Sequence, residues 1–412
     1  MSFLPCVKIF LIRIMSNFKK YIVVFCFCLM QHSLFAQAIN VFALNKEVLA
    51  ANKLAVANKD PKKLASFNVL IDLANKSLQF KPGSVMEKLN TPPSGDKHDY
   101  MSLAPYFWPN PDTKDGLPYI RKDGKTNPEV NDYKDKAYMP ALCAEVEKLA
   151  LAFYFTGDEK YAKHATTLLR VWFLDEATKM NPNLNFGQAV KGQNDGRGAG
   201  LIDTRHFIKV IEAVGLMQSS NSWTPSDNKA LQAWFSSFLE WMQTSKNGTE
   251  EMKATNNHGV WYDALRLSIS LFNGQKEDAN KIIQNAQLRL ANQMDDNNRF
   301  PLEMARTTSL HYSVFVIDAF LKIAKMGEAT GVNFWDPALN AKHTLKGAVE
   351  EMIPYLVEEK KWDGPQIKAF DFKEGMDILN LASSKFSCGN CKTYLDENYR
   401  FKNYNLLIFD TQ

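Results

Sequence analysis

Two short segments of the sequence carry side chains suited to acid–base chemistry on a charged substrate. The first contains Asn257 and His258, and the second contains Arg306 and Tyr312. An amide, an imidazole, a guanidinium and a phenol are together the groups needed to remove a proton next to a carboxylate and expel a β oxygen. The sequence therefore points to an elimination reaction on an acidic substrate.

The four side chains divide naturally between two tasks. A proton next to an ionised carboxylate is hard to remove, because the carbanion would carry a second negative charge. We expect Asn257, His258 and Arg306 to neutralise or hydrogen-bond that carboxylate and to stabilise its enolate form. A phenol has an ordinary pKa of about 10. We expect neighbouring cations to lower the pKa of Tyr312, so that it acts first as base and then as acid.

Each of these residues taken alone also has a purely structural explanation. Asn256 can cap a helix, and His258 can be a core histidine. Arg306 can pair with Glu303 one turn earlier, and Tyr312 can be ordinary helix packing. Only the combination of the side chains specifies a chemistry.

Helical periodicity dominates the chain beyond residue 40 and predicts the elements that must position these groups. Apolar residues recur at helical spacing in successive pairs of segments. The pairs are 41–57 with 62–78, 140–155 with 160–173, 204–217 with 227–244, 256–272 with 276–294, and 302–326 with 338–357. No strand-like alternation competes over most of this length. The pattern predicts an all-α fold of helical hairpins, with no linker that would separate domains.

Two long segments interrupt the helical rhythm. Residues 91–128 contain seven prolines and a group of aromatic residues, and residues 180–200 are rich in Asn and Gly. Prolines at this density exclude a helix, so we expect the first segment to be an aromatic lid. Gly196, Gly198 and Gly200 lack the spacing of a phosphate-binding loop, and they are interpreted as a flexible turn.

The first 36 residues have the pattern of a secretory signal peptide. Asn17–Lys20 is basic, residues 21–30 are apolar, and Ala36-Gln37-Ala38 offers a cleavage site. Met15 is a candidate for the true start, and an uncleaved anchor is the alternative. With cleavage, residues 37–412 form a single domain that is periplasmic or secreted, and no later stretch is long enough for a transmembrane helix.

Charge and composition narrow the class of protein further. The 412 residues are 45% hydrophobic and 23% charged, which excludes a disordered chain. The net charge of +4 comes from basic residues in the first 36 positions, and without them 45 basic and 45 acidic side chains remain. A neutral body does not favour a nucleic-acid partner. An anionic ligand must therefore be bound by a few local cations.

Metal and cofactor motifs are not found in the sequence. The histidines form no H-E-x-x-H pattern, and there is no G-x-S-x-G elbow. We therefore expect neither a catalytic metal nor a cofactor. Cys388 and Cys391 can form a disulfide, half of a metal site or two free thiols, and Cys143 is interpreted as core packing.

The segments resemble the alginate lyase superfamily of polysaccharide lyases. The similarity runs from Leu103-Ala104-Pro105-Tyr106-Phe107-Trp108-Pro109 through Asn194-Asp195-Gly196-Arg197-Gly198 and Asn257-His258 to Arg306 and Tyr312. The resemblance implies an incomplete (α/α) toroid of about six or seven helical hairpins, with long aromatic loops over the cleft. It also implies β-elimination of a uronate polymer, an anionic polysaccharide.

The resemblance also assigns roles to residues. Asn257 and His258 would bind the substrate carboxylate, Arg306 would assist them, and Tyr312 would be the catalytic acid and base. The interval of six residues from Arg306 to Tyr312 is more like the Bacteroidetes-type branches. The substrate therefore stays open between mannuronan, guluronan and glucuronan. In mannuronate one tyrosine can serve both steps, whereas in guluronate His258 is a candidate base.

Further candidates lie in the two long segments. Tyr106, Trp108, Arg121 and Gln188 are expected to line the cleft by stacking on sugars and hydrogen bonding to them.

Two other classes of function remain open. A glycoside hydrolase on a similar toroid would use paired carboxylates such as Asp203 and Glu303. A helical scaffold that binds glycans or proteins would need no catalytic groups. The sequence does not decide exo or endo action, or oligomeric state.

Overall fold

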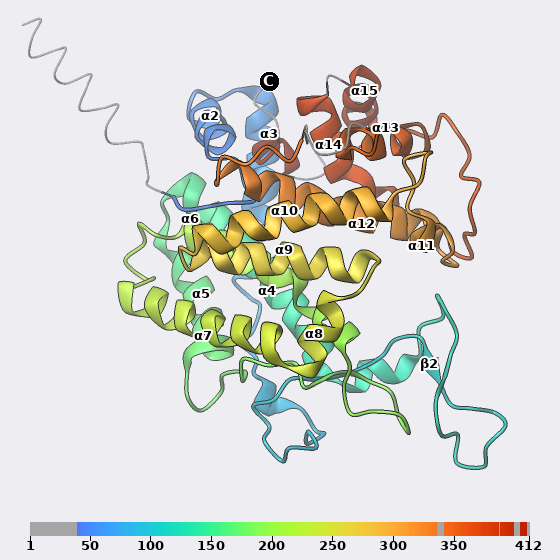
Figure 1. The fold of residues 1–412 in the computed structure, drawn as a ribbon. Coiled ribbons are helices and arrows are strands. Elements are labelled where there is room, and N and C mark those ends of the chain that lie inside the picture. Colours follow the sequence, from blue (N-terminus) through green and yellow to red (C-terminus); the bar gives the residue numbers. More distant parts are fainter. Residues whose placement is uncertain (1–38, 336–341, 387, 399–403, 410–412) are drawn as a thin grey trace, which may run out of the picture. The chain divides into compact units, whose positions relative to one another are not determined.

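Paired helices form most of the structure, a computed structural model that describes residues 39–335, 342–386, 388–398 and 404–409 (Figure 1). The chain divides into two units, Met1–Ile39 and Asn40–Gln412, and every element described here belongs to the second. The predicted signal peptide, residues 1–36, lies outside the described residues. Within the described residues, no helix combines the length and apolar character that a membrane span requires.

The described helices follow one another as six pairs joined by short or long connections. The pairs are α2 (Lys46–Ala57) with α3 (Pro61–Ser77), α4 (Lys134–Thr156) with α5 (Glu159–Leu169), α6 (Phe207–Leu216) with α7 (Pro225–Thr244), α9 (Asn257–Phe272) with α10 (Lys276–Gln293), α12 (Ser309–Glu328) with α13 (Leu345–Leu356), and α14 (Met376–Lys385) with α15 (Gly389–Asn398). Two short helices, α8 (Lys246–Met252) and α11 (Pro301–Met304), precede α9 and α12. Short 3-10 helices are Val85–Glu87, Pro128–Asp132, Gly198–His206, Phe372–Gly375 and Asn405–Leu407, and a π-helix spans Arg170–Leu174.

The inner helices pack on one another in chain order: α4 on α6, α6 on α9, α9 on α12, and α12 on α14. These helices contribute side chains to one cavity of about 480 Å³, including Glu147, Lys209, Trp261, Asp318 and Asp377. A layer of helices around a central cavity is the arrangement of an (α/α) toroid. The predicted all-α toroid and its number of hairpins are confirmed.

Local sequence signals explain where several helices begin and end. Asp60 caps α3, whose first residue is Pro61, and Thr224 forms a capping box with Asp227 at the start of α7. Helix α4 ends at Gly157, whose φ of 71° is in the left-handed region that glycine tolerates.

The predicted helix over residues 302–326 is wrong in its first part. Helix α11 ends at Met304 and α12 begins only at Ser309. The backbone N–H of Ser309 donates to the carbonyl of Pro365 at 2.9 Å, and the N–H of Ile367 donates to the carbonyl of Thr307 at 2.9 Å. These backbone groups bond to a distant segment, so the helix is interrupted at residues 305–308.

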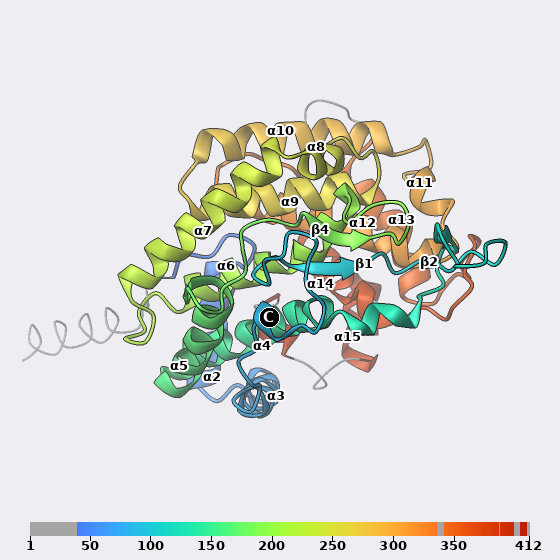
Figure 2. The same cartoon turned by 90° about the horizontal axis from the view of Figure 1, so that it is seen from below.

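The two long segments contain short strands that were not predicted. They are β1 (Met101–Leu103), β2 (Phe107–Trp108), β3 (Ile120–Arg121) and β4 (Phe186–Ala189). Strands β2 and β3 form an antiparallel hairpin, while β1 pairs in parallel with β4 (Figure 2). The parallel pair connects the proline-rich segment to the Asn/Gly-rich segment, so the two long segments pack together through their strands.

The glycines of the second segment are tightly packed, so their interpretation as a flexible turn is wrong. A Cβ atom at Gly196 would overlap the carbonyl oxygen of Asn185, and one at Gly200 would overlap that of Gly187. Glycine is needed here because backbone approaches backbone.

The states of the three described cysteines agree with the sequence predictions. Cys388 and Cys391 form a disulfide, which selects one of the three alternatives. Cys143 is a buried free thiol in α4 and serves as core packing, as expected.

Candidate active site

The four residues of the predicted catalytic group lie at the beginnings of two neighbouring helices. Asn257 and His258 open α9, Arg306 lies in the break before α12, and Tyr312 is in the first turn of α12. Helices α9 and α12 lie side by side (Figure 1). Hydrogen bonds from Asn257 to Glu303 of α11 hold the two helix starts at the same end.

Arg306 lies over the ring of Tyr312. Its guanidinium carbon is 3.6 Å from the ring centroid, a cation–π distance. The same guanidinium binds Asp123, with Nη2 2.7 Å from Oδ1 and Nε 3.1 Å from Oδ2. The ion-pair partner of Arg306 is therefore Asp123, and the alternative prediction of an ion pair with Glu303 is wrong. Asp123 belongs to the proline-rich segment, whose docking on the helix break fixes Arg306.

The phenol of Tyr312 is covered by a second phenol. Tyr106 Oη lies 3.0 Å from Tyr312 Oη, and Tyr312 is only 7% exposed. Burial raises the pKa of Tyr312 and the neighbouring Tyr106 raises it further, whereas the charge of Arg306 lowers it. Arg306 thus acts in the predicted direction, but burial outweighs it, and the pKa of Tyr312 lies well above its ordinary value; the prediction of a lowered pKa is wrong for this arrangement.

Asn257 is fixed by a buried carboxylate. Its backbone N–H donates to Glu303 Oε1 at 2.7 Å and its Nδ2 donates to Oε2 at 2.8 Å. Burial raises the pKa of Glu303, and the hydrogen bonds from Asn257 oppose that rise. Asn257 is 0% exposed, and its Oδ1 has no hydrogen-bond partner among the described residues. The preceding residue, Asn256, caps α9 as its structural explanation predicted.

His258 is the more accessible member of the pair. Its Nδ1 lies 2.6 Å from Oε1 of Glu251 in α8, and its side chain is 22% exposed. A carboxylate only accepts hydrogen bonds, so Nδ1 carries the proton in this contact. In the neutral ring Nε2 is then the basic nitrogen.

Gln188 is buried rather than presented to a ligand. It is 5% exposed, and its Nε2 donates to Asp203 at 3.0 Å. Arg197 donates to its Oε1 at 2.9 Å and lies 5.1 Å from the ring centroid of Phe107. Among the described residues, Arg197 Nε has no hydrogen-bond partner. Arg197 is a cation beside Gln188 and Phe107 that the sequence analysis did not single out, although it lies within the quoted Asn194–Gly198 motif.

Trp108 and Arg121 lie on the two strands of the β2–β3 hairpin. Trp108 is opposite Ile120, and Arg121 is opposite Phe107. Trp108 Nε1 donates to the carbonyl of Lys125 at 2.8 Å, and the ammonium of Lys122 lies 5.6 Å from its ring centroid. Arg121 is 55% exposed and its Nη2 is 2.7 Å from Asp123 Oδ1. Arg121 and Arg306 therefore share Asp123.

The carboxylates proposed for a hydrolase are both committed elsewhere. Asp203 is 4% exposed and accepts hydrogen bonds from Ser102 and Tyr100 at 2.9 and 3.1 Å, in addition to its ion pair with Lys136. Glu303 is 1% exposed and holds Asn257. A hydrolytic acid or base needs access to the glycosidic bond, so this pair does not favour hydrolysis.

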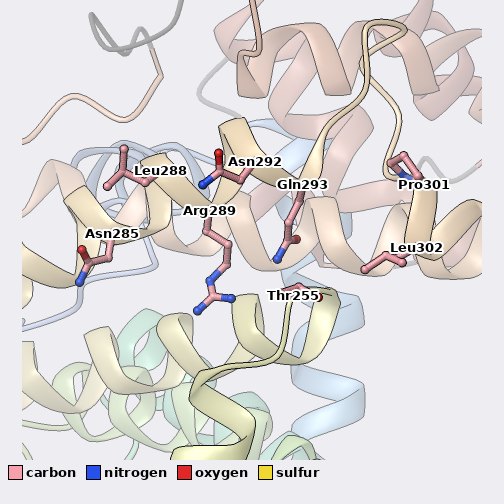
Figure 3. Close-up of a pocket in the computed structure, with 8 residues that line it drawn as sticks. All are labelled: Thr255, Asn285, Leu288, Arg289, Asn292, Gln293, Pro301 and Leu302. Atoms are coloured by element: carbon pink, nitrogen blue, oxygen red, sulfur yellow. The ribbon is translucent and has the colours of Figure 1, made fainter.

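A separate pocket of about 440 Å³ lies beside the starts of α9 and α11. It is lined by Thr255, Asn285, Leu288, Arg289, Asn292, Gln293, Pro301 and Leu302 (Figure 3). Arg289 bonds to Asp263 and to the carbonyls of Met252 and Ala254, so it supports the turn before α9. None of the predicted site residues lines this pocket. Within the described residues, no group of three or more His, Cys, Asp or Glu side chains is arranged to hold a metal ion.

Three carboxylates that position the predicted residues were not recognised from the sequence. Glu303 holds Asn257, Glu251 holds His258, and Asp123 holds Arg306. The sequence suggests Glu303 only as a partner for Arg306 or as one of a pair of hydrolytic carboxylates. Asp123 is 183 positions from Arg306, and no local pattern connects them.

Comparisons with known proteins agree with this arrangement. The family model described as "Alginate lyase" matches residues 84–362. An alginate lyase from Bacteroides ovatus is similar with a TM-score of 0.86 and 37% identity, over 91% of this chain and 100% of that chain. No curated protein matches the sequence.

More distant structures share the fold. Alginate lyase A1-III from Sphingomonas species A1 has a TM-score of 0.55 and 16% identity, over 87% of this chain and 92% of that chain. A variant of A1-III complexed with a tetrasaccharide has a TM-score of 0.55 and 15% identity, over 93% and 99% of the two chains. The family match covers more than half of the sequence, and the Bacteroides ovatus structure aligns with nearly all of it. The chain therefore belongs to the alginate lyase family and is a polysaccharide lyase.

Proposed function

We propose that this lyase cleaves an alginate-like polyuronate by β-elimination, with Tyr312 as base and acid. The observation that carries the proposal is the guanidinium of Arg306, 3.6 Å from the ring centroid of Tyr312. A cation held on the ring face stabilises the phenolate that the reaction requires. The A1-III variant complexed with a tetrasaccharide supports an oligosaccharide ligand for this fold.

The proposed reaction has two proton transfers. The phenolate of Tyr312 takes the C5 proton of the uronate, and the C5 carbanion is stabilised as the enolate of the carboxylate. The C4–O bond then breaks as the C4–C5 double bond forms, and Tyr312 returns the proton to the leaving oxygen. Tyr106 Oη, 3.0 Å from Tyr312 Oη, lies beside the oxygen that takes and returns the proton.

The carboxylate is proposed to bind at the start of α9. A helix N-terminus favours a negative charge, and His258 lies there with its side chain partly exposed. Asn257 is 0% exposed and its Nδ2 donates to Glu303, so a hydrogen bond from its amide to the carboxylate requires a rearrangement at the start of α9 when substrate binds. Arg306 completes the positive side of the site, although Asp123 already offsets its charge.

His258 is proposed to act as base for guluronate. There the proton lies on the opposite face of the sugar from the leaving oxygen, so one tyrosine cannot reach both. The contact between Glu251 and Nδ1 leaves Nε2 as the basic nitrogen of the neutral ring. The site thus contains a base for each epimer.

The proposed site of action follows from the sequence of residues 1–36. A signal peptide with a cleavage site at Ala36-Gln37-Ala38 would direct the enzyme to the periplasm or the exterior. An enzyme that meets a large anionic polymer fits that location.

The test is a panel of mannuronan, guluronan and glucuronan, followed by ultraviolet absorbance of the new double bond. We expect the wild-type enzyme to form unsaturated uronate from at least one polymer and Tyr312→Phe to form none, with an unchanged circular dichroism spectrum. New reducing ends without the double bond would indicate a hydrolase. Binding of polymer without turnover would indicate a scaffold.

A further inference from the structure

Asp123 connects the proline-rich segment to the catalytic helix through several contacts. Its carboxylate accepts hydrogen bonds from Nε and Nη2 of Arg306 at 3.1 and 2.7 Å. It also accepts from the backbone N–H and Oγ1 of Thr307 at 3.2 and 3.0 Å. Arg121 forms a further ion pair at 2.7 Å. The carboxylate thus holds two nitrogens of Arg306 and the residue that follows it.

We propose that Asp123 is a positioning residue for the proposed elimination: it holds the guanidinium of Arg306 over the ring of Tyr312 and offsets part of its charge. This inference rests on the proposed role of Tyr312. Arg306 uses Nε and Nη2 for Asp123, so only Nη1 remains for other partners. The principal neighbour of the guanidinium face is then the tyrosine ring, 3.6 Å from the guanidinium carbon.

The charged and titratable groups around Tyr312 come from four parts of the chain: the connection before α12, the proline-rich segment, α12 itself and the 3-10 helix Phe372–Gly375. Arg306 lies on the ring face, and Tyr106 of the proline-rich segment lies against the hydroxyl. His311, paired with Glu374, meets the ring edge with a centroid distance of 5.1 Å. Asp123, which is paired with Arg306, opposes ionisation of the phenol, and Glu303 is a second negative charge that acts on Arg306.

A purely structural role for Asp123 makes a different prediction. If the carboxylate only docked the loop, its neutral replacement would lower activity at every pH equally. If it sets the charge at Tyr312, the neutral replacement also makes the phenol easier to ionise. The pH dependence of kcat therefore separates the two roles.

The experiment compares Asp123→Asn with two control variants in the full-length mature enzyme. Asparagine keeps an acceptor for Arg306 and removes the negative charge. Asp112→Asn changes an exposed aspartate in the same segment. Thr307→Val removes the hydroxyl that bonds to Asp123 and leaves the ion pair in place. Rates of double-bond formation are measured across pH for all four proteins.

We expect the rising limb of the kcat profile of Asp123→Asn to move to lower pH by roughly half a unit to one unit. Its maximal kcat is expected to fall about tenfold, with a smaller change in KM, because Arg306 is held by fewer bonds. The limbs of Asp112→Asn and Thr307→Val should coincide with that of the wild type. An unmoved limb in Asp123→Asn, or an equal shift in Thr307→Val, overturns the inference.

Two further measurements keep the test decisive. If Asp123→Asn does not fold, Asp123→Ser is measured instead, and the same shift to lower pH is expected because it is also neutral. Tyr312→Phe is measured in parallel. Substantial activity in Tyr312→Phe would contradict the proposed function itself. If Tyr312→Phe is inactive but the rising limb of the kcat profile of Asp123→Asn does not move, only the role of Asp123 is contradicted.

Discussion

Tyr106 and Tyr312 place their hydroxyl oxygens 3.0 Å apart, although 206 positions separate them in the sequence. The two phenols are chemically alike, but their surroundings differ. Only Tyr312 has a guanidinium on its ring face, that of Arg306. The structure therefore brings together two candidate proton carriers and places a guanidinium against Tyr312.

Replacing Tyr106 with phenylalanine should leave an active enzyme. The phenol of Tyr106 raises the pKa of Tyr312, so its removal makes Tyr312 easier to ionise. We expect Tyr106→Phe to retain kcat within about tenfold of the wild type, with its rising pH limb displaced toward lower pH. Steady-state rates across pH measure both effects. Complete loss of turnover in Tyr106→Phe, alongside an active Tyr312→Phe, would reverse the assignment of the two tyrosines.

Replacing Glu303 with glutamine should damage both stability and catalysis. The carboxylate accepts two hydrogen bonds from Asn257, and an amide group can accept only with its one oxygen. One buried donor is then unpaired, which costs about 1–3 kcal/mol of unfolding free energy. We expect a lower midpoint in urea unfolding and a fall in kcat of about tenfold or more, because the start of α9 shifts.

The exposed Glu277 at the start of α10 provides the control for this prediction. Glu277→Gln should match the wild type in both measurements. Wild-type stability and rate in Glu303→Gln would show that the hydrogen bonds between Asn257 and Glu303 contribute to neither stability nor catalysis.

Replacing Glu251 with glutamine should change the preference between the two epimers. Glu251 fixes the proton of His258 on Nδ1, so that Nε2 of the neutral ring is the nitrogen that can accept a proton. We expect Glu251→Gln to lose about tenfold or more of its kcat/KM on guluronan and clearly less on mannuronan, where Tyr312 serves both steps. Glu250→Gln, one position earlier in α8, is the matched control. Equal losses on the two polymers would contradict a role for His258 as base.

Glu212 should make the stability of the enzyme depend on pH. It is 3% exposed, and its carboxylate accepts hydrogen bonds from the backbone N–H groups of Phe42 and Leu44. Burial raises its pKa from 4.5 to about 7, and these hydrogen bonds oppose the rise. Between these two pH values the folded protein holds a proton that the unfolded chain has released, so stability falls as pH rises.

The corresponding variant is Glu212→Gln, compared with the wild type by urea unfolding at pH 4.5 and pH 8. The contribution of Glu212 amounts to about 3 kcal/mol over this interval, to order of magnitude. We expect the wild type to lose that much relative to the variant as pH rises. Parallel pH dependences of the two proteins would show that Glu212 does not titrate in this range.

Much of the fold could be predicted because its signals are local. Apolar spacing predicted five of the six described helical pairs but not α14 with α15, and capping residues such as Asp60 and Asn256 stand beside the helices that they begin. The break at residues 305–308 was missed because its cause is not local. The backbone there bonds to residues near Pro365, which no periodicity of the segment itself records.

The sequence by itself determined the helical hairpins and the types of groups available for elimination: an amide, an imidazole, a guanidinium and a phenol. Only the tertiary structure decided that Tyr106 covers Tyr312, that Asp123 holds Arg306 and that Gln188 is buried. The physical reason is the range of the interactions. Helix formation depends on neighbours within a turn or two, whereas these contacts join residues brought together by packing of distant segments.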